Sequence, residues 1–379
     1  MKKPLMSMIW MMMFFGMTCG DSTTKSNQSV SDLIDPNATQ ETIHLYHYLK
    51  ENSGSSLMFG MHDATGYGVG WSNDDRRSDV KDVCGDYPAV FSWDFLTMFE
   101  NETEAARMLD RIQFAYNSGG INTICWHFRD YEKNSFYADG LQYAVVPSIL
   151  PVGKYHENYK LSLIQIAEFA RKCRGKKGEL IPIIFRPFHE QNGSWFWWGK
   201  GHRTEQQYID LWQFTVHYLR DTLEVHNFIY AFSPDGNQWE NKTDYLTDYP
   251  GDDYVDMFGV DFYFPNGDAL TITRFQQRCR HIVEYAQERD KVAAVTEAGS
   301  RKDWQLSELA IPNWFTTCLL APIKGDDIAK DVSFACVWRN ASTTHHFAPY
   351  PGHSSVPDFL IFYNDDYTMF LKDLEKVYQ

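Results

Sequence analysis

Residues 180–190 read LIPIIFRPFHE, an apolar run that ends abruptly in ionisable side chains. A short run of this kind, rich in β-branched residues, predicts a strand that is buried on both faces, as the strands of parallel sheets are. Ligands of parallel sheets bind outside the carboxyl ends of the strands, so the polar residues from Arg186 to Glu190 stand where a functional site is expected. A strand buried on both faces needs other buried strands beside it, so this stretch predicts a parallel sheet.

Seven other apolar runs of strand length accompany Leu180–Phe185: Leu57–His62, Ala89–Trp93, Ile121–His127, Phe228–Phe232, Met257–Asp261, Val292–Thr296 and Val332–Trp338. Stretches of helical period separate most of them, at Glu102–Tyr116, Tyr159–Lys172, Glu205–Leu219, Ile272–Glu288 and Ser307–Leu320, and a last one follows at Asp366–Val377. This alternation is typical of βα units and a parallel sheet. Eight strands, without a G-x-G-x-x-G motif after the first, predict a (β/α)8 TIM barrel rather than an open doubly wound sheet. No composition shift or repeat interrupts residues 40–379, so we expect a single domain there.

The N-terminus has the pattern of a targeting segment. Two lysines precede an apolar run at residues 5–15, which is too short for a permanent membrane span, and small or apolar residues lead to Cys19. A cysteine at this place resembles the bacterial lipoprotein signal, which predicts removal of residues 1–18, lipid attachment at Cys19 and anchoring to the periplasmic or surface face of the outer membrane. Residues 19–39 are polar and are expected to form a flexible tether. Ordinary secretion with an incidental cysteine is the alternative.

The composition favours an uncharged ligand whose flat apolar surfaces can stack on aromatic side chains. A formal net charge of −15 argues against nucleic acid, which proteins bind through Lys and Arg. The 12 Trp and 22 Tyr give more aromatic surface than packing requires, and sugar-binding clefts use such rings, although many of them are simply core residues.

No metal or cofactor site is predicted. The six cysteines after Cys19 show no C-x-x-C pair or other metal-ligand spacing, so we interpret them mostly as buried thiols, with a disulfide among them left open. The adjacent His345 and His346 have no further ligands at metal spacing and are interpreted as loop surface. The sequence says nothing of the oligomeric state.

Two glutamates end strands on opposite sides of the predicted barrel. Glu190 follows the fourth strand and leads into NGSWFWWG, which contains Trp195, and Glu297 ends the seventh strand in VTEAGS. Side chains at the tips of these strands face each other over a barrel mouth, and two carboxylates that flank a bond are what glycoside hydrolysis needs. The alternatives are a structural ion pair of Glu190 with Arg186 and a helix cap at Glu297.

Other polar or aromatic residues follow the remaining strands: His62, Asp63, His127, Asp261, Tyr263, Trp338 and Arg339. His127 can contact a ligand or be a satisfied core histidine, and Trp338 can stack on a sugar or merely pack. For His62 and Asp63, substrate binding and capping of a loop are equally good interpretations.

From about residue 40 to the C-terminus the chain resembles the β-mannanases of glycoside hydrolase family 26, within the clan of retaining (β/α)8 glycosidases. The resemblance rests on RPFHE and GSWFWWG in residues 186–199 and on TEAG at residues 296–299. It implies cleavage of β-1,4-mannosidic bonds in mannan, galactomannan or glucomannan, by endo attack or with release of mannobiose, without a cofactor.

The resemblance also implies roles for single residues. Glu190 is then the general acid/base and Glu297 the nucleophile of a double displacement, with carboxyl groups about 5–5.5 Å apart and a raised pKa on Glu190. His189, where most of the clan carries Asn, would contact the sugar near its 2-hydroxyl or orient Glu190, and Tyr263 would hydrogen-bond the nucleophile. The remaining implied substrate-binding residues are His127, Trp195, Trp338 and Arg339.

Two other functions stay open at the level of the sequence. The same family contains hydrolases of β-1,3-xylan and mixed-linkage β-glucan, and the motifs report the chemistry better than the sugar. The second is a lipoprotein that binds glycans without cutting them, although binding alone would not require both carboxylates. Endo versus exo action and tolerance of galactose branches are not predicted.

Overall fold

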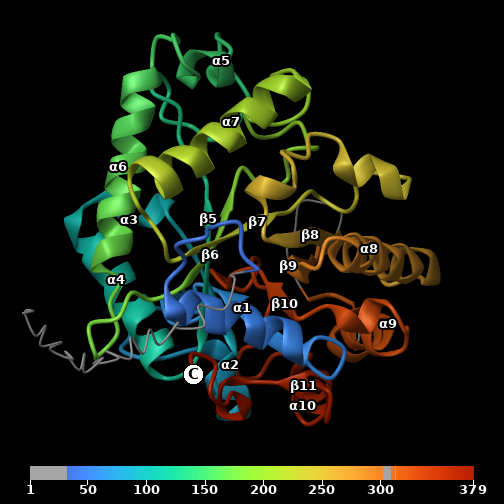
Figure 1. Ribbon diagram of the computed structural model, residues 1–379. Helices are drawn as coiled ribbons and strands as arrows, with labels where there is room; N and C mark the ends of the chain where they lie inside the picture. Colours follow the sequence, from blue (N-terminus) through green and yellow to red (C-terminus); the bar gives the residue numbers. More distant parts are fainter. Residues whose placement is uncertain (1–31, 302–308, 312) are drawn as a thin grey trace, which may run out of the picture. The chain divides into compact units, whose positions relative to one another are not determined.

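The computed structural model describes residues 32–301, 309–311 and 313–379 (Figure 1). The predicted signal peptide, Cys19 and the first part of the predicted tether lie outside these residues. Within the described part of the chain, no helix is both long and apolar enough to cross a membrane.

Eight parallel strands close into a barrel, and they follow one another around it in chain order. They are β1 (Leu57–His62), β4 (Val90–Asp94), β5 (Ile121–Trp126), β6 (Ile183–Pro187), β7 (Phe228–Phe232), β8 (Met257–Phe264), β9 (Val292–Ser300) and β10 (Phe334–Val337). The barrel closes where β10 pairs with β1, from Met58 beside Phe334 to Met61 beside Val337. The predicted TIM barrel is therefore confirmed, with each strand at its expected place and its ends shifted by a few residues.

The longer helices lie around the outside of the barrel (Figure 1). They are α4 (Glu102–Asn117), α6 (His156–Lys172), α7 (Glu205–His217) and α8 (Ala269–Glu288). Three of them, α4, α7 and α8, have an N-cap side chain that accepts a backbone N–H of the first turn. These N-cap residues are Asn101, Thr204 and Asp268, and each satisfies a donor that the start of a helix leaves unpaired.

Shorter elements complete the fold. The short α-helices are α2 (Asp79–Cys84), α3 (Leu96–Glu100), α5 (Val145–Ile149), α9 (Ala321–Lys324) and α10 (Val356–Tyr363). A hairpin joins β2 (Tyr67–Gly68) to β3 (Trp71–Ser72), and β11 (Thr368–Met369) adds to β1. π-helical turns cover η1 (Tyr218–Thr222) and η4 (Trp314–Leu320), and 3-10 turns cover η2 (Lys242–Leu246), η3 (Asp252–Tyr254), η5 (Ala329–Asp331) and η6 (Leu371–Asp373).

Two predicted helices differ from the structure. No long helix forms at Asp366–Val377, because Thr368 pairs with Leu57 of β1 in β11 and only the single turn η6 follows. Of the predicted helix Ser307–Leu320, residues 314–320 form the π-helical η4, and part of the rest lies outside the described residues. Backbone pairing with the barrel outweighs a weak helical period in the first case.

Helix α1 (Gln40–Asn52) covers the amino ends of the barrel strands. Its apolar side chains Leu45, Tyr46 and Leu49 share a buried cluster with residues at the strand starts: Met58, Val90, Ile121, Ile184, Ile229, Met257, Val292 and Phe334. Before α1, Leu33 is buried and the backbone N–H of Ile34 donates to Asp256 at 2.8 Å. Packing against the barrel thus begins before residue 40. The chain enters the barrel at the amino ends of the strands, opposite their carboxyl ends.

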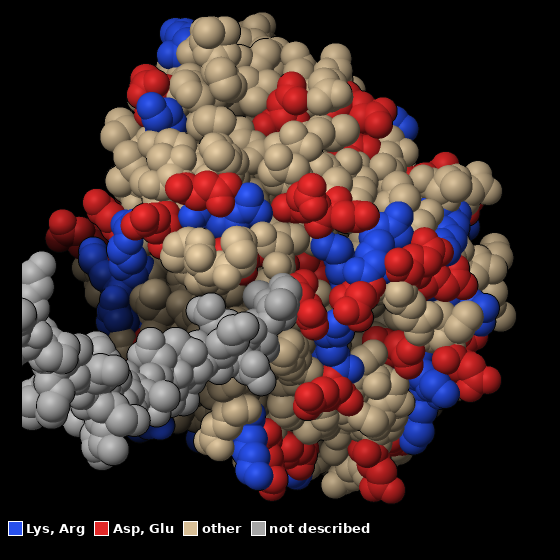
Figure 2. All heavy atoms as spheres, in the orientation of Figure 1, with Lys and Arg blue, Asp and Glu red and all other residues tan. Residues whose placement is uncertain are grey.

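The six cysteines of the described part are free, and all but Cys84 are buried, as expected for structural thiols. On the face that Figure 2 shows, acidic and basic side chains are interspersed.

Candidate active site

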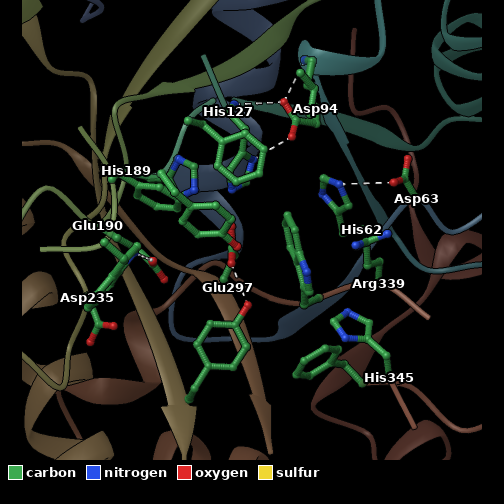
Figure 3. A pocket seen from close by; sticks show the side chains of 18 of the residues that line it. His62, Asp63, Asp94, His127, His189, Glu190, Asp235, Glu297, Arg339 and His345 are labelled. Carbon is green, nitrogen blue, oxygen red and sulfur yellow. Dashed lines mark hydrogen bonds and ion pairs between the residues drawn. The ribbon is translucent and has the colours of Figure 1, made fainter. Parts of the chain in front are cut away.

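A cleft of about 640 Å³ opens at the carboxyl ends of the barrel strands (Figure 3). It brings together every site residue predicted inside the barrel: His127, His189, Glu190, Trp195, Tyr263, Glu297, Trp338 and Arg339. His62 and Asp63, whose role the sequence left open, line the same cleft. In Figure 3, Glu190 lies on one side of the cleft and His62 on the other, with Glu297 between them.

The loop after β6 delivers Glu190 through a strained turn. Phe188 and Glu190 both adopt left-handed backbone conformations, with φ of 49° and 53°. Such conformations cost about 1–3 kcal/mol each in residues other than glycine. The backbone N–H of Glu190 donates to the carbonyl of Ser233 at 2.9 Å, and the indole N–H of Trp195 donates to Oε2 of Glu190 at 2.8 Å. The turn therefore places the carboxyl group in the cleft with a fixed orientation.

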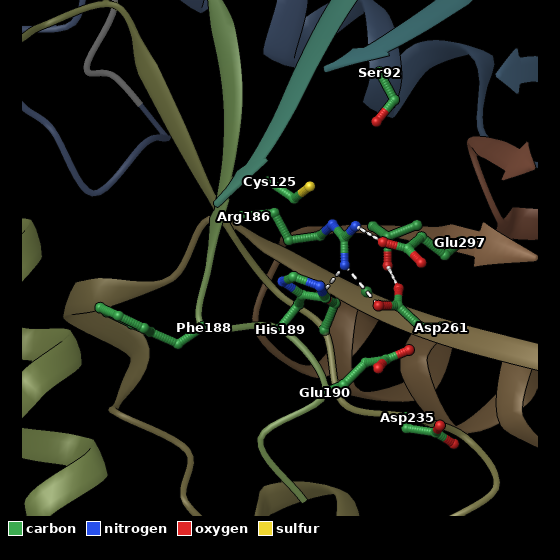
Figure 4. Close-up of polar contacts among 12 residues, drawn as sticks. Ser92, Cys125, Arg186, Phe188, His189, Glu190, Asp235, Asp261 and Glu297 are labelled. Atoms are coloured by element: carbon green, nitrogen blue, oxygen red, sulfur yellow. Dashed lines mark hydrogen bonds and ion pairs between the residues drawn. The ribbon is translucent and has the colours of Figure 1, made fainter. Parts of the chain in front are cut away.

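Glu297, in the carboxyl-terminal half of β9, has both carboxylate oxygens engaged, and Figure 4 shows its contact with Arg186. Arg186, which ends the apolar run of β6, donates to Oε1, and the hydroxyl of Tyr263 donates to Oε2 at 2.7 Å. The same guanidinium donates to Oδ2 of Asp261 at 2.6 Å. Glu297 is thus held in one orientation and matched with a buried positive charge.

The two glutamates lie close together in different electrostatic surroundings. Carboxylate oxygens of Glu190, Asp261 and Glu297 lie within 4.8 Å of one another. Burial raises the pKa of Glu190 well above its ordinary value, and the negative charges of Asp235, Glu297 and Asp261 raise it further. Glu190 therefore keeps its proton at pH values where an ordinary glutamate has lost it, whereas Glu297 faces a guanidinium.

Two groups in the described part of the chain have ligand atoms close enough together to hold a metal ion. They are Glu190, Asp261 and Glu297, and Asp94, Cys125 and His127. In the first group Arg186 already bonds Asp261 and Glu297, and in the second Nδ1 of His127 lies 2.6 Å from a carboxylate oxygen of Asp94. Internal partners thus already engage most of these donor atoms.

Two histidines line the cleft between the glutamates and β5. Burial lowers the pKa of His189 well below its ordinary value, with further lowering from Arg186, so its ring is neutral. The ring centres of His189 and His127 lie 4.6 Å apart. Asp94 fixes His127 by accepting its backbone N–H at 3.1 Å in addition to the ring contact. The uncharged ring of His189 suits contact with a sugar hydroxyl.

The far side of the cleft is a connected aromatic and polar network. The rings of His62 and Trp338 stack with centres 4.0 Å apart. Tyr67 donates to Asp63 at 2.6 Å, and Arg339 donates to the Tyr67 hydroxyl at 3.0 Å. Burial acts to raise the pKa of Asp63, but His62, Tyr67 and Arg339 together lower it below its ordinary value. A wall that carries the charged groups of Asp63 and Arg339 suits recognition of hydroxyl groups.

Several lining residues escaped the sequence analysis. His345 lines the cleft and His346 is buried, so their interpretation as loop surface is wrong. Lining residues that were not singled out are Tyr67, Asp94, Leu96, Thr97, Phe136, Tyr137, Phe196, Asp235, Gln238, Arg301 and Phe347. Asp94 ends β4 and Asp235 follows β7 by three residues, so inspection of every strand end would have found the first. Tyr67 lies in a hairpin, and nothing in its local sequence marks it.

Comparison with known proteins places the chain among polysaccharide hydrolases. The model of glycosyl hydrolase family 26 matches residues 34–316, which include both glutamates. The chain is 34% identical over 313 residues to a mannan endo-1,4-beta-mannosidase of Bifidobacterium adolescentis, with 78% of this chain covered but only 31% of that relative. The fold is similar to a double mutant of a Cellulomonas fimi endo-beta-1,4-mannanase, with a TM-score of 0.86, 36% identity and coverage of 92% of this chain and 79% of that one. It is also similar to the catalytic domain of a Bacillus sp. JAMB-750 endo-beta-1,4-mannanase, with a TM-score of 0.84, 36% identity and coverage of 92% and 96%.

Proposed function

The chain belongs to glycosyl hydrolase family 26, and from this premise we propose that it hydrolyses β-1,4-mannosidic bonds in mannans with retention of configuration. The observation that carries the proposal is the pair Glu190 and Glu297, whose carboxylate oxygens lie within 4.8 Å of each other at the carboxyl ends of β6 and β9. Retaining glycosidases place their two carboxyl groups about 5–5.5 Å apart, whereas inverting ones leave room for a water between them.

The first step forms a covalent intermediate. A carboxylate oxygen of Glu297 attacks the anomeric carbon while the protonated Glu190 gives its proton to the glycosidic oxygen, so the C–O bond breaks and the shortened sugar chain leaves. Tyr263 and Arg186 hold Glu297 in line for this attack, and the raised pKa of Glu190 keeps its proton available.

The second step releases the sugar. Glu190, now ionised, takes a proton from a water molecule, whose oxygen attacks the anomeric carbon and displaces Glu297. Two inversions at the same carbon retain its configuration. His127, His189, Trp195, Trp338 and Arg339 bind the sugars on either side of the bond in this proposal, because all five line the cleft around the two glutamates.

Mannan is the substrate class that the relatives favour. The Bifidobacterium relative and both structural relatives above carry mannanase names, although the first is much longer than this chain. A β-1,3-xylanase or a mixed-linkage β-glucanase would use the same two glutamates. Substrate preference is therefore tested separately from the chemistry.

The deciding experiment compares products from unbranched mannan, β-1,3-xylan and mixed-linkage β-glucan. Wild-type protein is expected to release manno-oligosaccharides, with the β-anomer as first product by NMR. Glu190→Ala and Glu297→Ala are each expected to lose activity by a factor of about 10³ or more, whereas Glu102→Ala, at an exposed site on α4, keeps it. Activity on another glycan alone would overturn the substrate, an α-anomer would overturn the mechanism, and active glutamate variants would overturn the site.

We further propose that the protein is exported and anchored by lipid at Cys19 to the outer membrane. The support is the two lysines, the apolar run at residues 5–15 and the cysteine that follows. In cell fractionation, the full chain is expected with the membranes and Cys19→Ala in the soluble fraction. Retention of Cys19→Ala on the membranes would overturn the anchor and leave the enzymatic proposal untouched.

A further inference from the structure

The loop that joins β6 to α7 holds the strained turn at Glu190, and part of the support of this loop lies behind the cleft. Glu190 keeps a φ of 53°, which only surrounding contacts can maintain. Its own backbone makes two hydrogen bonds, donating to the carbonyl of Ser233 at 2.9 Å and accepting from the N–H of Gly193 at 3.0 Å. In addition to these bonds and the bond from Trp195, a buried ion pair holds the loop behind the cleft.

Arg203 ends this loop directly before Thr204, the N-cap of α7. Its guanidinium donates two hydrogen bonds to the carboxylate of Asp248, at 2.5 and 2.6 Å. It donates two more to backbone carbonyls of the loop, to Gln191 and to Trp198, each at 3.0 Å. Gln191 directly follows Glu190, so the guanidinium is bonded to a carbonyl of the residue next to the acid/base.

Asp248 supplies the other half of the pair from a different loop. It follows η2, between β7 and β8, and has a left-handed φ of 67°. The side chains of Arg203 and Asp248 are each only 3% exposed. A second link lies nearby, where the Asn192 side chain exchanges two hydrogen bonds with the backbone of Asp235, at 2.8 and 2.9 Å. The β6 loop is thus fastened to the segment that follows β7.

A buried ion pair is weak evidence for a stabilising role, because desolvation of the two charges offsets most of their attraction. What this pair does supply is geometry, since the planar guanidinium satisfies four acceptors in fixed directions. Neither residue lines the cleft, so neither touches the sugar directly.

We propose that Arg203 and Asp248 are a positioning pair that fixes the carboxyl group of Glu190 for proton transfer. The inference rests on the proposed function of Glu190 as the acid/base. It gives a specific expectation: loss of the pair impairs protonation of the leaving group more than it impairs attack by Glu297.

The test compares two substrates that differ in their need for an acid. Mannohexaose has a poor leaving group that must be protonated, whereas 2,4-dinitrophenyl β-mannobioside loses its phenolate without help. Arg203→Lys keeps the positive charge but loses the planar arrangement of guanidinium donors. Asp248→Asn keeps the shape of the side chain but loses the negative charge. Both variants are expected to lose about 10- to 100-fold in kcat/KM on mannohexaose, and only a few-fold on the dinitrophenyl substrate.

A matched control separates positioning from general weakening of the fold. Asn227 is 1% exposed and donates to the carbonyl of Ile181 at 2.7 Å, at the amino end of the barrel. Asn227→Ala is expected to affect both substrates equally. Equal losses on both substrates for Arg203→Lys and Asp248→Asn, or no loss, would overturn the positioning role. If Arg203→Lys does not fold, Asp248→Asn decides.

A crystal structure of a pair variant gives a readout that needs no substrate. We expect the Glu190 carboxyl group to leave hydrogen-bond distance of the Trp195 indole in that structure. An unchanged Glu190 would overturn the positioning role even if mannan is the correct substrate. Conversely, a wild-type protein that cuts no mannan while the variant structure shows the displacement would overturn the proposed substrate alone.

Discussion

The indole N–H of Trp195 donates to Oε2 of Glu190 across 2.8 Å, so a residue of the cleft wall bonds directly to the proposed acid/base. This bond opposes the other influences on the same group. Burial and the charges of Asp235, Glu297 and Asp261 raise the pKa of Glu190 well above 4.5, and the bond from Trp195 lowers it. The pKa of Glu190, and with it the pH range of activity, therefore depends on neighbouring side chains that can be substituted one at a time.

Trp195→Phe removes the N–H and keeps most of the ring. Because the bond lowers the pKa of Glu190, its loss raises that pKa, and the alkaline limb of kcat/KM is expected to move to higher pH. The pH profile on mannohexaose measures this shift. Trp71→Phe is the control, since its indole bonds Asp79 outside the cleft. An alkaline limb that stays in place or moves to lower pH would contradict the assignment of Glu190 as the acid.

Asp235→Asn is expected to shift the same limb in the opposite direction. Burial raises the pKa of Asp235 itself to about 6, so this residue is ionised over the neutral and alkaline range. Its negative charge raises the pKa of Glu190, and its removal lowers that pKa. The alkaline limb therefore moves to lower pH. Opposite shifts in the Trp195 and Asp235 variants would identify one titrating group behind both profiles.

Tyr263→Phe removes one of the two donors to Glu297. Loss of a donor to a reacting group costs about 10²- to 10³-fold in kcat, and we expect a loss of that order on mannohexaose. Burial, and then the charge of Glu297, raises the pKa of Tyr263 well above 10, so the hydroxyl stays protonated and the loss should not vary with pH. Tyr249→Phe, whose hydroxyl bonds the exposed Asp252, is expected to keep full activity.

Arg186→Met is expected to destabilise the fold as well as the site. It leaves the carboxylates of Asp261 and Glu297 buried without their cation, which costs about 3–5 kcal/mol in the free energy of unfolding. Burial raises the pKa of Asp261 well above its ordinary value and the charge of Arg186 lowers it, so loss of Arg186 raises that pKa further. The folded protein then binds more protons than the unfolded chain, and the variant loses stability as the pH rises through the raised pKa of Asp261.

Urea denaturation of the Arg186 variant at acidic and neutral pH measures both effects. The deficit relative to wild type should be larger at neutral pH. Arg280→Met, which breaks a more exposed pair with Asp326, is expected to cost less than about 1 kcal/mol at either pH. Equal deficits for the two variants would contradict the role of Arg186 as the counter-charge of the site.

The barrel and the two glutamates could be predicted because their signals are local. A strand buried on both faces is mostly apolar, and a polar residue shortly after it stands at the barrel mouth, as Glu190 does. Asp235 and Tyr67 reach the cleft through loops whose path depends on the rest of the fold. No period or motif marks such residues, and only the structure reveals them.

Long-range contacts also explain why the helix predicted at the C-terminus does not form. Asp366–Val377 has a helical period, but Thr368 and Met369 pair with the first barrel strand instead. Arg203 and Asp248 are a related case, because a charged residue in a polar stretch reads as surface and only the fold buries it. Sequence patterns indicate the secondary structure that a segment favours in isolation. Long-range contacts determine whether the segment adopts that structure in the folded protein.

The entry of the chain beneath the barrel has a consequence for the whole enzyme. Ile34 and α1 are fastened at the amino ends of the strands, and the cleft opens at their carboxyl ends. A lipid attached upstream of residue 32 would therefore connect to the barrel at the end opposite the cleft, so that the attachment point and the substrate site do not compete for the same face of the protein.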